Sequence, residues 1–529
     1  MPGWTYADVW EHIADLVPDA PALVHGGDRR SWREFSTRAD GVAATLVGAG
    51  LGRQDAVAQY LYNGNEYLES LFACLKAGFM PVNTNYRYVE DELAYLWDNA
   101  DVAAVVFHGT FTERIESVRQ RVPRVRAWLW VDDGSCRCPD WATPYDDAAS
   151  VAVDRVVASW GRDGDDLILI YTGGTTGMPK GVMWRQDDLY NSHSQSIWKD
   201  PVEPDLAAVT ERVTRRLGPV ALPACPLMHG TGLFVAMQQL SQAGCVVSAT
   251  ARRFDEETLL DTFEREGVNV AAIVGDVYAK PMLRALDAEP ERWDLSRLKV
   301  LVSSGAMWSA EVKAGLLKHQ PRLVMIDTFA SSEAAGMGQS VTRGDDRMST
   351  ARFRVGPDTR VIGDDGQDVE PGSGQRGLVA VGGFQPSGYY KDQAKTDATF
   401  KVIDGKRYVV PGDHVTVEAD GTLTFLGRGS TCINTGGEKV YPEEVEEALK
   451  RHPGVRDAVV LGVPDERFGE AVVAVVEGEF DADELIALAK QHVAGYKAPR
   501  RIISVDTIGR APNGKVDHRR LRELATARS

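Results

Sequence analysis

The chain has 529 residues and a formal net charge of −17. This length exceeds what one hydrophobic core usually holds, so two or three domains are expected. Hydrophobic residues make up 43% of the chain and charged residues 26%, as in an ordinary globular protein. The acidic balance argues against a nucleic-acid-binding protein and against a protein that anionic lipid holds by charge.

Cysteine usage and the N-terminus indicate the compartment. Only Cys136 and Cys138 lie close together, and without a second pair or a nearby histidine this spacing is a poor zinc signature. Free thiols in a reducing cytoplasm are therefore predicted. The N-terminus lacks the features of a signal peptide, and no apolar run is long enough to span a bilayer. We expect a cytoplasmic monomer or homodimer, with peripheral membrane association left open.

The first part of the chain alternates helical and strand patterns. Ser31 is a plausible N-cap, and Gly50 a plausible end, for the first helix of this series. The predicted elements are a helix at 31–50, a strand at 55–64, a helix at 66–79, a strand at 80–85, a helix at 89–100 and a strand at 102–107. Such alternation predicts a largely parallel sheet covered by helices. Buried strands are also expected near 166–172, 299–306 and 322–330.

The amino-acid composition of the chain changes after about residue 355. Segments rich in glycine, aspartate and β-forming residues predict hairpins there. From about Gly427 a new unit begins, with helices predicted at 441–455 and 481–493 and strands at 458–466 and 471–478. We predict an α/β protein with an N-terminal core of helix-covered sheets plus a β-rich subdomain at 1–427. A small α+β domain follows at 428–529.

The most informative segment is YTGGTTGMPKG, at residues 171–181, which follows the buried strand DLILI. Its glycines let the backbone bend tightly and approach a ligand, and successive N–H groups in such a loop can bind an anion. Its threonines add hydroxyl donors and its lysine adds a positive charge, which suits the phosphates of ATP. The candidate nucleotide-binding residues of this loop are Thr172, Gly173, Gly174, Thr175, Thr176, Gly177 and Lys180.

This loop is not the P-loop of the common nucleotidases, because Met178 stands where that pattern requires its second glycine. The alternative is a flexible surface turn. A mere turn does not need three threonines and a lysine directly after a buried strand, so the phosphate-binding interpretation is preferred.

The segment YTGGTTGMPKG resembles the phosphate-binding signature of the adenylate-forming superfamily, which comprises acyl-CoA synthetases, luciferases and peptide-synthetase adenylation domains. Further segments resemble other motifs of that superfamily and follow in its order over most of the chain. They are CPLMHGTG, SSGA, DTFASSE, YVVPGD, GR, TGGEK and PNGK. The ordered set is more specific than any single motif.

The resemblance implies a nucleotide site and an acyl site that adjoin. For the nucleotide, Gly305 and Ala306 would pack on adenine, Asp327 would reach its amino group, and Ser332 would contact phosphate. Ser332 stands where threonine is usual. The candidate residues of the acyl pocket are His229, Gly275, Ser304, Ala330 and Ser331. A core histidine is the alternative for His229, and Ala330 replaces the usual glycine.

The resemblance also implies a catalytic set. Glu333, with Thr176, would ligate Mg²⁺, a hard cation that prefers oxygen ligands. Lys515 would be the lysine that serves adenylation, and His229 would sit at the wall of the acyl and adenylate pocket. Catalytic roles therefore fall to Lys515, Glu333, His229 and Thr176.

The C-terminal part carries further expectations from the resemblance. Asp413 would accept the ribose hydroxyls, which suits a carboxylate with two acceptor oxygens, and Arg428 would hold the ribose or phosphate. Gly436 and Gly437 would line the coenzyme A tunnel. The superfamily's hinge falls at Ser430, where aspartate or lysine is usual, and the small domain would rotate there between two half-reactions.

The predicted activity is that of an ATP-dependent acyl-CoA synthetase, which joins a carboxylate to coenzyme A through an acyl-adenylate. ATP, coenzyme A and a hydrophobic carboxylic acid are the expected partners, with Mg²⁺ as the cofactor and no nucleic acid. The combined segments GGTTGMPKGVMWRQDD and VGDVYAKPM are similar to actinobacterial enzymes that activate fatty acids or steroid side-chain carboxylates. A medium-chain, long-chain or polycyclic acid is therefore expected.

Several rivals remain open. An acyl-AMP ligase that loads a carrier protein shares the same motifs, although no carrier domain is fused here. A luciferase-like oxygenase has no specific support. VGAGLG, at residues 47–52, misses the dinucleotide fingerprint and closes a helix, which disfavours a nicotinamide-linked oxidoreductase. A non-enzymatic nucleotide-binding protein would not need the candidate catalytic residues together.

Overall fold

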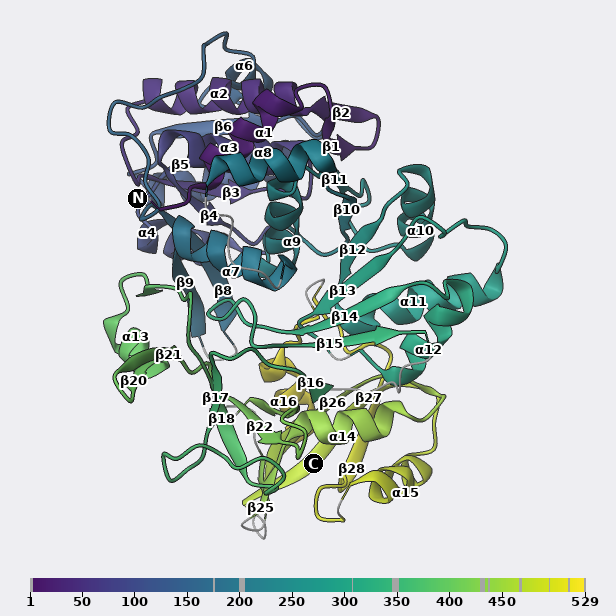
Figure 1. Ribbon diagram of the computed structural model, residues 1–529. Coiled ribbons are helices and arrows are strands. Elements are labelled where there is room, and N and C mark those ends of the chain that lie inside the picture. The colour runs from purple at the N-terminus through teal and green to yellow at the C-terminus, as the bar shows by residue number, and fades with distance from the viewer. Residues whose placement is uncertain are drawn as a thin grey trace.

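The computed structural model of the chain describes residues 3–174, 177–198, 205–306, 308–344, 352–428, 433–435, 438–465, 469–493, 495–511 and 514–527. Figure 1 shows the N-terminal elements at the top, strands β12–β15 in the middle, and the C-terminal elements at the bottom. This is the predicted α/β architecture, with a β-rich part and a small α+β unit after it.

Two largely parallel sheets form the N-terminal core of the described chain. In sheet order the first contains β15 (Gly338–Arg343), β14 (Val324–Phe329), β13 (Val300–Ser304), β12 (Val270–Ile273), β10 (Val220–Pro223), β11 (Cys245–Ser248), β1 (Pro21–His25) and β2 (Asp28–Ser31). The second contains β19 (Gly388–Tyr389), β9 (Gly177–Arg185), β8 (Leu167–Gly174), β4 (Met80–Asn83), β3 (Ala56–Tyr60), β5 (Val102–His108), β6 (Ala127–Val131) and β7 (Thr143–Pro144). Antiparallel pairs occur at their edges.

Helices cover these sheets. In chain order they are α1 (Tyr6–Leu16), α2 (Trp32–Gly48), α3 (Asn65–Ala77), α4 (Glu90–Asn99), α5 (Thr112–Val118), α6 (Tyr145–Ala149), α7 (Gln186–Trp198), α8 (Leu206–Arg215), α9 (Gly230–Ser241), α10 (Glu256–Arg265), α11 (Gly275–Ala288) and α12 (Ala310–His319). Every residue of β3 and β5 is buried, as expected for strands with helices on both faces. The strand and helix predictions for residues 31–107 are confirmed.

Local sequence explains where these elements begin. The Ser31 side chain accepts the N–H of Glu34, and the Glu34 side chain accepts the N–H of Ser31, which forms a capping box for α2. This confirms Ser31 as the N-cap. Such a cap is worth about 1 kcal/mol of helix stability.

The third sheet is antiparallel and follows the N-terminal core. It contains β16 (Arg352–Phe353), β23 (Leu423–Arg428), β22 (Asp413–Val417), β18 (Arg376–Val381), β21 (Lys406–Val409) and β20 (Phe400–Ile403), with β17 (Thr359–Ile362) paired to β18. Asp404 and Gly405 join β20 to β21, and both have positive φ, at 50° and 76°. A two-residue Asp-Gly turn of this kind matches the twist of a hairpin, as the sequence predicted. Helix α13 (Gln393–Thr399) precedes β20.

The fourth sheet lies wholly after residue 432 in the described chain. It contains β25 (Glu438–Val440), β24 (Ile433–Thr435), β27 (Gly469–Gly478) and β26 (Val455–Asp465), with β28 (Arg501–Val505) paired to β27. The helices of this unit are α14 (Pro442–Lys450), α15 (Ala482–His492) and α16 (His518–Ala527).

The fourth sheet is buried on both faces. Ala458 and Val460 of β26 pack in a core with α14 and α15, whereas Val459 and Leu461 pack in a second core with α16. Successive side chains of a strand point to opposite faces, so one apolar run serves both cores. The α+β character predicted for this unit is confirmed, while the exact boundary at 427–428 and the rotation of the unit stay predictions.

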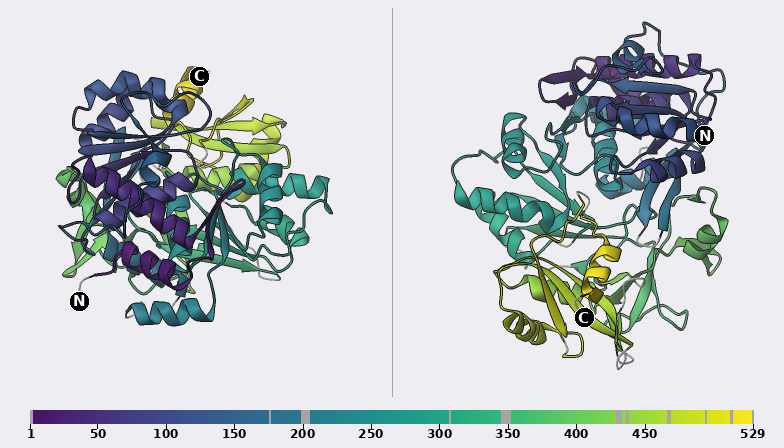
Figure 2. Two further views of the ribbon diagram at one scale, coloured as in Figure 1. Left: turned by 90° about the horizontal axis from the view of Figure 1, so that it is seen from above. Right: turned by 180° about the vertical axis from the view of Figure 1, so that it is seen from behind.

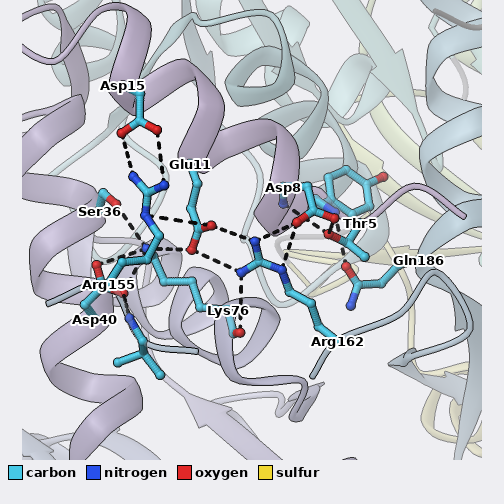
Figure 3. Close-up of polar contacts among 12 residues, drawn as sticks. Thr5, Asp8, Glu11, Asp15, Ser36, Asp40, Lys76, Arg155, Arg162 and Gln186 are labelled. Atoms are coloured by element: carbon cyan, nitrogen blue, oxygen red, sulfur yellow. Dashed lines mark hydrogen bonds and ion pairs between the residues drawn. The ribbon is translucent and has the colours of Figure 1, made fainter. Parts of the chain in front are cut away.

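A buried ion cluster ties α1 to the rest of the N-terminal core (Figure 3). Lys76 is fully buried, and its Nζ lies 3.0 Å from carboxylate oxygens of both Glu11 and Asp40. The guanidinium of Arg162 lies 2.6 Å from Glu11 Oε2 and 2.6 Å from Asp8 Oδ1. We call Lys76, Glu11, Asp40 and Arg162 the N-terminal ion cluster. It joins helices α1, α2 and α3 to the segment that precedes β8.

In the part of the chain that the structure describes, no helix is both long enough and apolar enough to cross a membrane.

Candidate active site

A cavity of about 1520 Å³ lies where the first sheet, the third sheet and the C-terminal unit meet. Its wall includes residues of the β8–β9 hairpin, helix α9, the ends of β13 and β14, strand β22, and the segment before α16. Figure 2 shows from behind that C-terminal residues, in yellow, rise from the foot of the molecule toward the teal strands. Elements from distant parts of the sequence therefore enclose one space.

The predicted phosphate loop forms the tip of the β8–β9 hairpin. Thr172 pairs with Lys180, and Gly174 pairs with Gly177, across this antiparallel ladder. The side chain of Lys180 lines the cavity, and its Nζ lies 2.7 Å from Asp392 Oδ2. Gly173 belongs to the same strand as Thr172. The predicted residues Thr175 and Thr176 lie outside the described residues.

Two aromatic side chains hold the segment that ends at Glu333. The Tyr389 hydroxyl donates to Glu333 Oε1 at 2.6 Å, and Trp184 Nε1 donates to the Ser332 carbonyl at 2.9 Å. Both Ser332 and Glu333 line the cavity. The carboxylate of Glu333 is thus held beside the phosphate hairpin, where a hard cation would find an oxygen ligand.

The C-terminal ends of β13 and β14 form another part of the wall, with Ser304, Gly305, Ala306 and Asp327. Parallel strands bring their carboxyl ends to one edge of the sheet, which is where ligands bind in such folds. Asp327 is buried, and Lys313 Nζ lies 3.3 Å from its Oδ2. Burial raises the pKa of Asp327 to about 6, although the charge of Lys313 opposes the shift.

Asp413 and Arg428 are neighbours across the β22–β23 ladder. Asp413 is buried at the start of β22 and lines the cavity. The side chain of Arg428 lies outside the described residues, but its backbone position faces Asp413. The two predicted ribose-binding residues therefore share one place in the third sheet.

A tight turn presents Lys515 to the cavity. The Ala511 N–H donates to the Lys515 carbonyl at 2.7 Å, and the Gly514 N–H donates to the Ala511 carbonyl at 2.8 Å. Gly514 has a φ of +75°, and a Cβ there would come within 2.7 Å of Val274 Cγ1. Glycine is needed at this position, because the turn presses closely against the end of β12.

A second ion cluster, whose side chains are half-buried, supports this turn. Arg510 Nη1 donates to the Gly514 carbonyl at 2.8 Å, and Arg510 Nε lies 2.5 Å from Asp457 Oδ2. Lys450 Nζ lies 3.1 Å from Asp457 Oδ1. Burial raises the pKa of Asp457, but the charges of Lys450 and Arg510 oppose this shift and lower the pKa to about 2. We call Asp457, Lys450 and Arg510 the C-terminal ion cluster.

His229 precedes α9 and is partly exposed to the cavity, which itself lies deep in the protein. Burial lowers the pKa of His229 to about 3, and the charges of Lys515 and Arg87 lower it further in the same direction. The imidazole is therefore neutral near pH 7. His229 and Lys515 both line this cavity.

An apolar arm extends the cavity away from His229 and Lys515. Helix α9 forms one wall of it and the first sheet forms the other. The apolar side chains that line this arm are Phe234, Val235, Val270, Val300, Val302 and Ile326. Ala330 and Ser331 line the cavity at the junction with the polar end.

The cavity gathers most of the candidate residues that the structure describes. Those that line it are Thr172, Lys180, His229, Ser304, Gly305, Ala306, Asp327, Ala330, Ser331, Ser332, Glu333, Asp413 and Lys515. Gly275 is buried behind the wall, where its N–H donates to Ser303 Oγ at 2.9 Å, and its neighbours Asp276 and Val277 line the cavity instead. Gly436, Gly437 and Ser430 lie outside the described residues.

The residues that support the candidate side chains were missed by sequence reasoning. Tyr389, Trp184 and Lys313 each contact a candidate residue or its backbone, and Arg510 contacts the backbone of the residue before Lys515. Tyr389 reaches Glu333 because β19 pairs with β9, a contact between segments about 200 residues apart in sequence. No local sequence pattern predicts such a pairing, so the sequence alone did not indicate these four supporting residues.

Family comparisons agree with the geometry. The family described as AMP-binding enzyme matches residues 10–390, and the family described as AMP-binding enzyme C-terminal domain matches residues 444–515. A medium/long-chain-fatty-acid–CoA/3-oxocholest-4-en-26-oate–CoA ligase of Mycolicibacterium smegmatis is 39% identical, over 99% of this chain and 96% of its own. The 3-oxocholest-4-en-26-oate–CoA ligase of Rhodococcus rhodochrous is 39% identical, over 97% and 94%.

Among solved structures, the anthranilate CoA ligase AuaEII in complex with anthranoyl-AMP superimposes with a TM-score of 0.83. The match covers 100% of this chain and 98% of that one, at 20% sequence identity. At this identity the likeness establishes the fold.

Proposed function

The chain belongs to the AMP-binding enzyme family and is a carboxylate–CoA ligase, and from this premise we propose that its substrate is a medium-chain, long-chain or steroid side-chain carboxylate. The observation that carries the proposal is the apolar arm that continues from the polar end of the cavity. The whole cavity, of about 1520 Å³, exceeds the roughly 300–1,000 Å³ of an ordinary small-molecule pocket. The space suits a nucleotide together with a bulky acid.

The wall of the arm also supports a hydrophobic acid. Valine and isoleucine side chains from β12, β13 and β14 face Phe234 and Val235 of α9. Burial of apolar substrate surface against such a wall contributes about 25 cal/mol for each Å² removed from water. A short acid such as acetate leaves the arm empty and gains little of this energy.

In the first half-reaction the carboxylate attacks the α-phosphorus of ATP, and pyrophosphate leaves. Two anions must meet, so the main task of the protein is to neutralise and position charge. Lys515 acts on the carboxylate and the α-phosphate oxygens. Lys180, with the hairpin at 172–177, binds the departing pyrophosphate. Neutral His229 contributes shape and a hydrogen bond at the reacting end, because its lowered pKa prevents it from carrying charge there.

The nucleoside lies against the ends of β13 and β14. Gly305 and Ala306 pack on the adenine, and Asp413 with Arg428 binds the ribose. Asp327 lies at this edge beside Lys313, and its carboxyl group accepts a hydrogen bond from the adenine amino group.

Mg²⁺ is the implied cofactor, and the residues present fit it. The Glu333 carboxylate lies in the cavity, and the hydroxyl of Tyr389 holds it in place. Glu333, with Thr176, would hold the ion, which when bound neutralises charge on the phosphates.

In the second half-reaction the thiol of coenzyme A attacks the acyl carbon and AMP leaves. The present arrangement, with Lys515 in the cavity, supports the adenylation half. The loop with Gly436 and Gly437 serves the thiol half after the C-terminal unit has rotated about Ser430.

The test is acid-dependent formation of acyl-CoA, with pyrophosphate release measured for acetate, octanoate, palmitate and a cholanoate-type acid. Turnover is expected for the last three, and most strongly for the longest or the polycyclic acid. Turnover of acetate alone would overturn the substrate proposal. Acyl transfer to a holo-carrier protein, but not to coenzyme A, would favour an acyl-AMP ligase instead.

A further inference from the structure

One short segment of the chain holds two candidate residues at the phosphate end of the cavity. Residues 387–392, which we call the linking segment, lie between β18 and β20 of the third sheet but pair with β9 of the second sheet. In this segment Tyr389 donates to the carboxylate of Glu333, and three residues later Asp392 accepts from the ammonium of Lys180. The proposed metal ligand and the proposed pyrophosphate-binding lysine therefore share one support.

Main-chain hydrogen bonds fix the linking segment against the phosphate hairpin. The Ser387 N–H donates to the Met183 carbonyl at 2.8 Å. The Tyr390 N–H donates to the Gly181 carbonyl, also at 2.8 Å. Gly181 directly follows Lys180 in β9, so the segment is bound to the strand that carries the lysine. The place of the segment relative to the lysine is thus set by the backbone and not by side chains alone.

The start of α13 fixes the other end of the segment. Thr396 Oγ1 accepts the N–H of Tyr389 at 2.9 Å and donates to the Asp392 carbonyl at 2.8 Å. Gly388 lies against the same threonine. Its φ is +151°, and a Cβ there would come within 2.6 Å of Thr396 Cγ2. Glycine is needed at this position, because a larger residue would push the threonine out of these two bonds.

Both oxygens of the Asp392 carboxylate are engaged. Oδ2 accepts from Lys180 Nζ at 2.7 Å, and Oδ1 accepts the Lys395 N–H at 2.9 Å, as the N-cap of α13. The bonds from the Lys180 ammonium and from the Lys395 N–H lower the pKa of Asp392, so its carboxylate is ionised near pH 7. Within the residues that the structure describes, Asp392 is the ion-pair partner of Lys180.

Asp392 contacts the lysine from outside the cavity, because Lys180 lines the cavity and Asp392 does not. Both side chains are partly exposed, so the pair adds little to folding stability. A lysine side chain has many rotamers, and ordering it only when the phosphates arrive would cost entropy at that step. An ion pair that already orders the ammonium removes this cost before the reaction begins.

We propose that Asp392 is a positioning residue of the adenylation half-reaction, which holds the Lys180 ammonium at the phosphate end of the cavity. This inference rests on the proposed function, because it assumes that Lys180 binds the departing pyrophosphate. An ammonium has three donors, so Nζ keeps its bond to Asp392 while it donates to phosphate oxygens. Through Tyr389 and Asp392, the linking segment then sets the spacing between the Glu333 carboxylate and the cation.

Asp392→Asn tests the negative charge alone, because asparagine is as good an N-cap as aspartate and keeps an oxygen for the Lys395 N–H. The kcat of acyl-adenylate formation, measured by pyrophosphate release, is expected to fall about tenfold, with little change in the KM for the acid. Thioester formation from supplied acyl-AMP and the melting temperature should stay at the wild-type values.

Asp397→Asn is the matched control, because Asp397 is exposed on the same helix and does not line the cavity. This variant should adenylate at the wild-type rate. A wild-type kcat in Asp392→Asn, or an equal loss in both variants, would overturn the positioning role.

A double-mutant cycle separates positioning of the lysine from a purely structural role in α13. Lys180→Ala should slow adenylation by about 10²–10³-fold, because a cation at developing charge is lost. Asp392→Asn should add little in that background, since its effect passes through the lysine. A further tenfold loss in the Lys180→Ala background would show that Asp392 acts by another route, against the proposal.

Binding of pyrophosphate with Mg²⁺ gives a readout that does not need turnover. In titration calorimetry, Asp392→Asn is expected to bind pyrophosphate several-fold more weakly than the wild type, since the lysine is no longer held in place. Tighter binding would mean that Asp392 competes with phosphate for Lys180, which would contradict positioning. Absence of acid-dependent pyrophosphate release by the wild type with every acid would instead overturn the ligase proposal, so the two failures are distinguishable.

Discussion

The two ion clusters use the same chemistry in very different places. In the N-terminal ion cluster Lys76 is fully buried among Glu11, Asp40 and Arg162, none of which lines the cavity. In the C-terminal ion cluster Lys450, Asp457 and Arg510 all line the cavity, and Arg510 binds the backbone of the turn that carries Lys515. The N-terminal ion cluster is the more deeply buried of the two, and only the C-terminal ion cluster contacts the reacting space.

This difference teaches that buried ion pairs do not by themselves mark a functional site. An ion pair inside a core keeps helices together, whereas an ion pair beside a catalytic turn fixes the position of a reacting group. The first kind should act on the free energy of unfolding and the second on the rate of one half-reaction. Three variants test this distinction and a fourth tests the acid sensitivity that a buried histidine causes, from the largest expected effect to the smallest.

The largest effect is expected for Lys76→Met. Removal of one partner leaves buried carboxylates without their cation, which typically costs about 3–5 kcal/mol of folding free energy. Unfolding in guanidinium chloride measures the loss, and the adenylation rate per folded molecule should stay at the wild-type value. Lys318→Met is the control, because Lys318 is exposed on α12. If Lys76→Met slowed adenylation without lowering the free energy of unfolding, the distinction between the two clusters would be wrong.

The next effect concerns the residue that the C-terminal ion cluster supports. Lys515→Ala should slow acyl-adenylate formation by about 10²–10³-fold, because a positioned cation at developing charge is lost. Thioester formation from supplied acyl-AMP should be largely spared. The two half-reactions are measured separately, by pyrophosphate release and by acyl-CoA formation. Equal losses in both halves would contradict the assignment of Lys515 to adenylation alone.

A third experiment separates ion pairs from buried histidines as the source of acid sensitivity. The pKa of His193 is about 3 in the folded protein and about 6.5 when unfolded. Its contribution to stability is complete above the unfolded pKa. It is lost as the pH falls toward the folded pKa, because only the unfolded state takes up the proton.

Between pH 7 and pH 5 the free energy of unfolding of the wild type should therefore fall by about 2 kcal/mol more than that of His193→Gln. Denaturant unfolding at the two pH values measures this difference. Asp457 stays ionised across this interval, since its pKa is about 2. Parallel pH dependences of the two proteins would argue that His193 is not buried in its neutral form.

The smallest effect is expected for Arg510→Lys. Lysine keeps the charge beside Asp457 but lacks the planar fork that also reaches the Gly514 carbonyl. Adenylation should slow by about tenfold, the equivalent of one lost hydrogen bond, with little change in melting temperature. Thioester formation from supplied acyl-AMP should change less. Arg451→Lys, on the exposed side of the same unit, is the matched control, and a loss shared by both variants would refute a positioning role for Arg510.

Local sequence determined the elements and much of the candidate site. The capping box of Ser31, the Asp-Gly turn at residues 404–405 and the alternating apolar residues of β26 are short-range features, so they can be read without a partner. The phosphate hairpin and the ordered motifs also lie in the sequence itself. For that reason the family could be predicted, and most of the described candidate residues do line the cavity.

Tertiary structure alone decided which side chains support the site and which walls enclose the acyl arm. Tyr389 reaches Glu333, and Arg510 reaches both Asp457 and Gly514, through contacts that the chain makes only after distant strands have paired. The apolar side chains of α9 and of the first sheet line one space only because α9 packs along that sheet. The arm therefore follows from packing, and no local sequence pattern contains it.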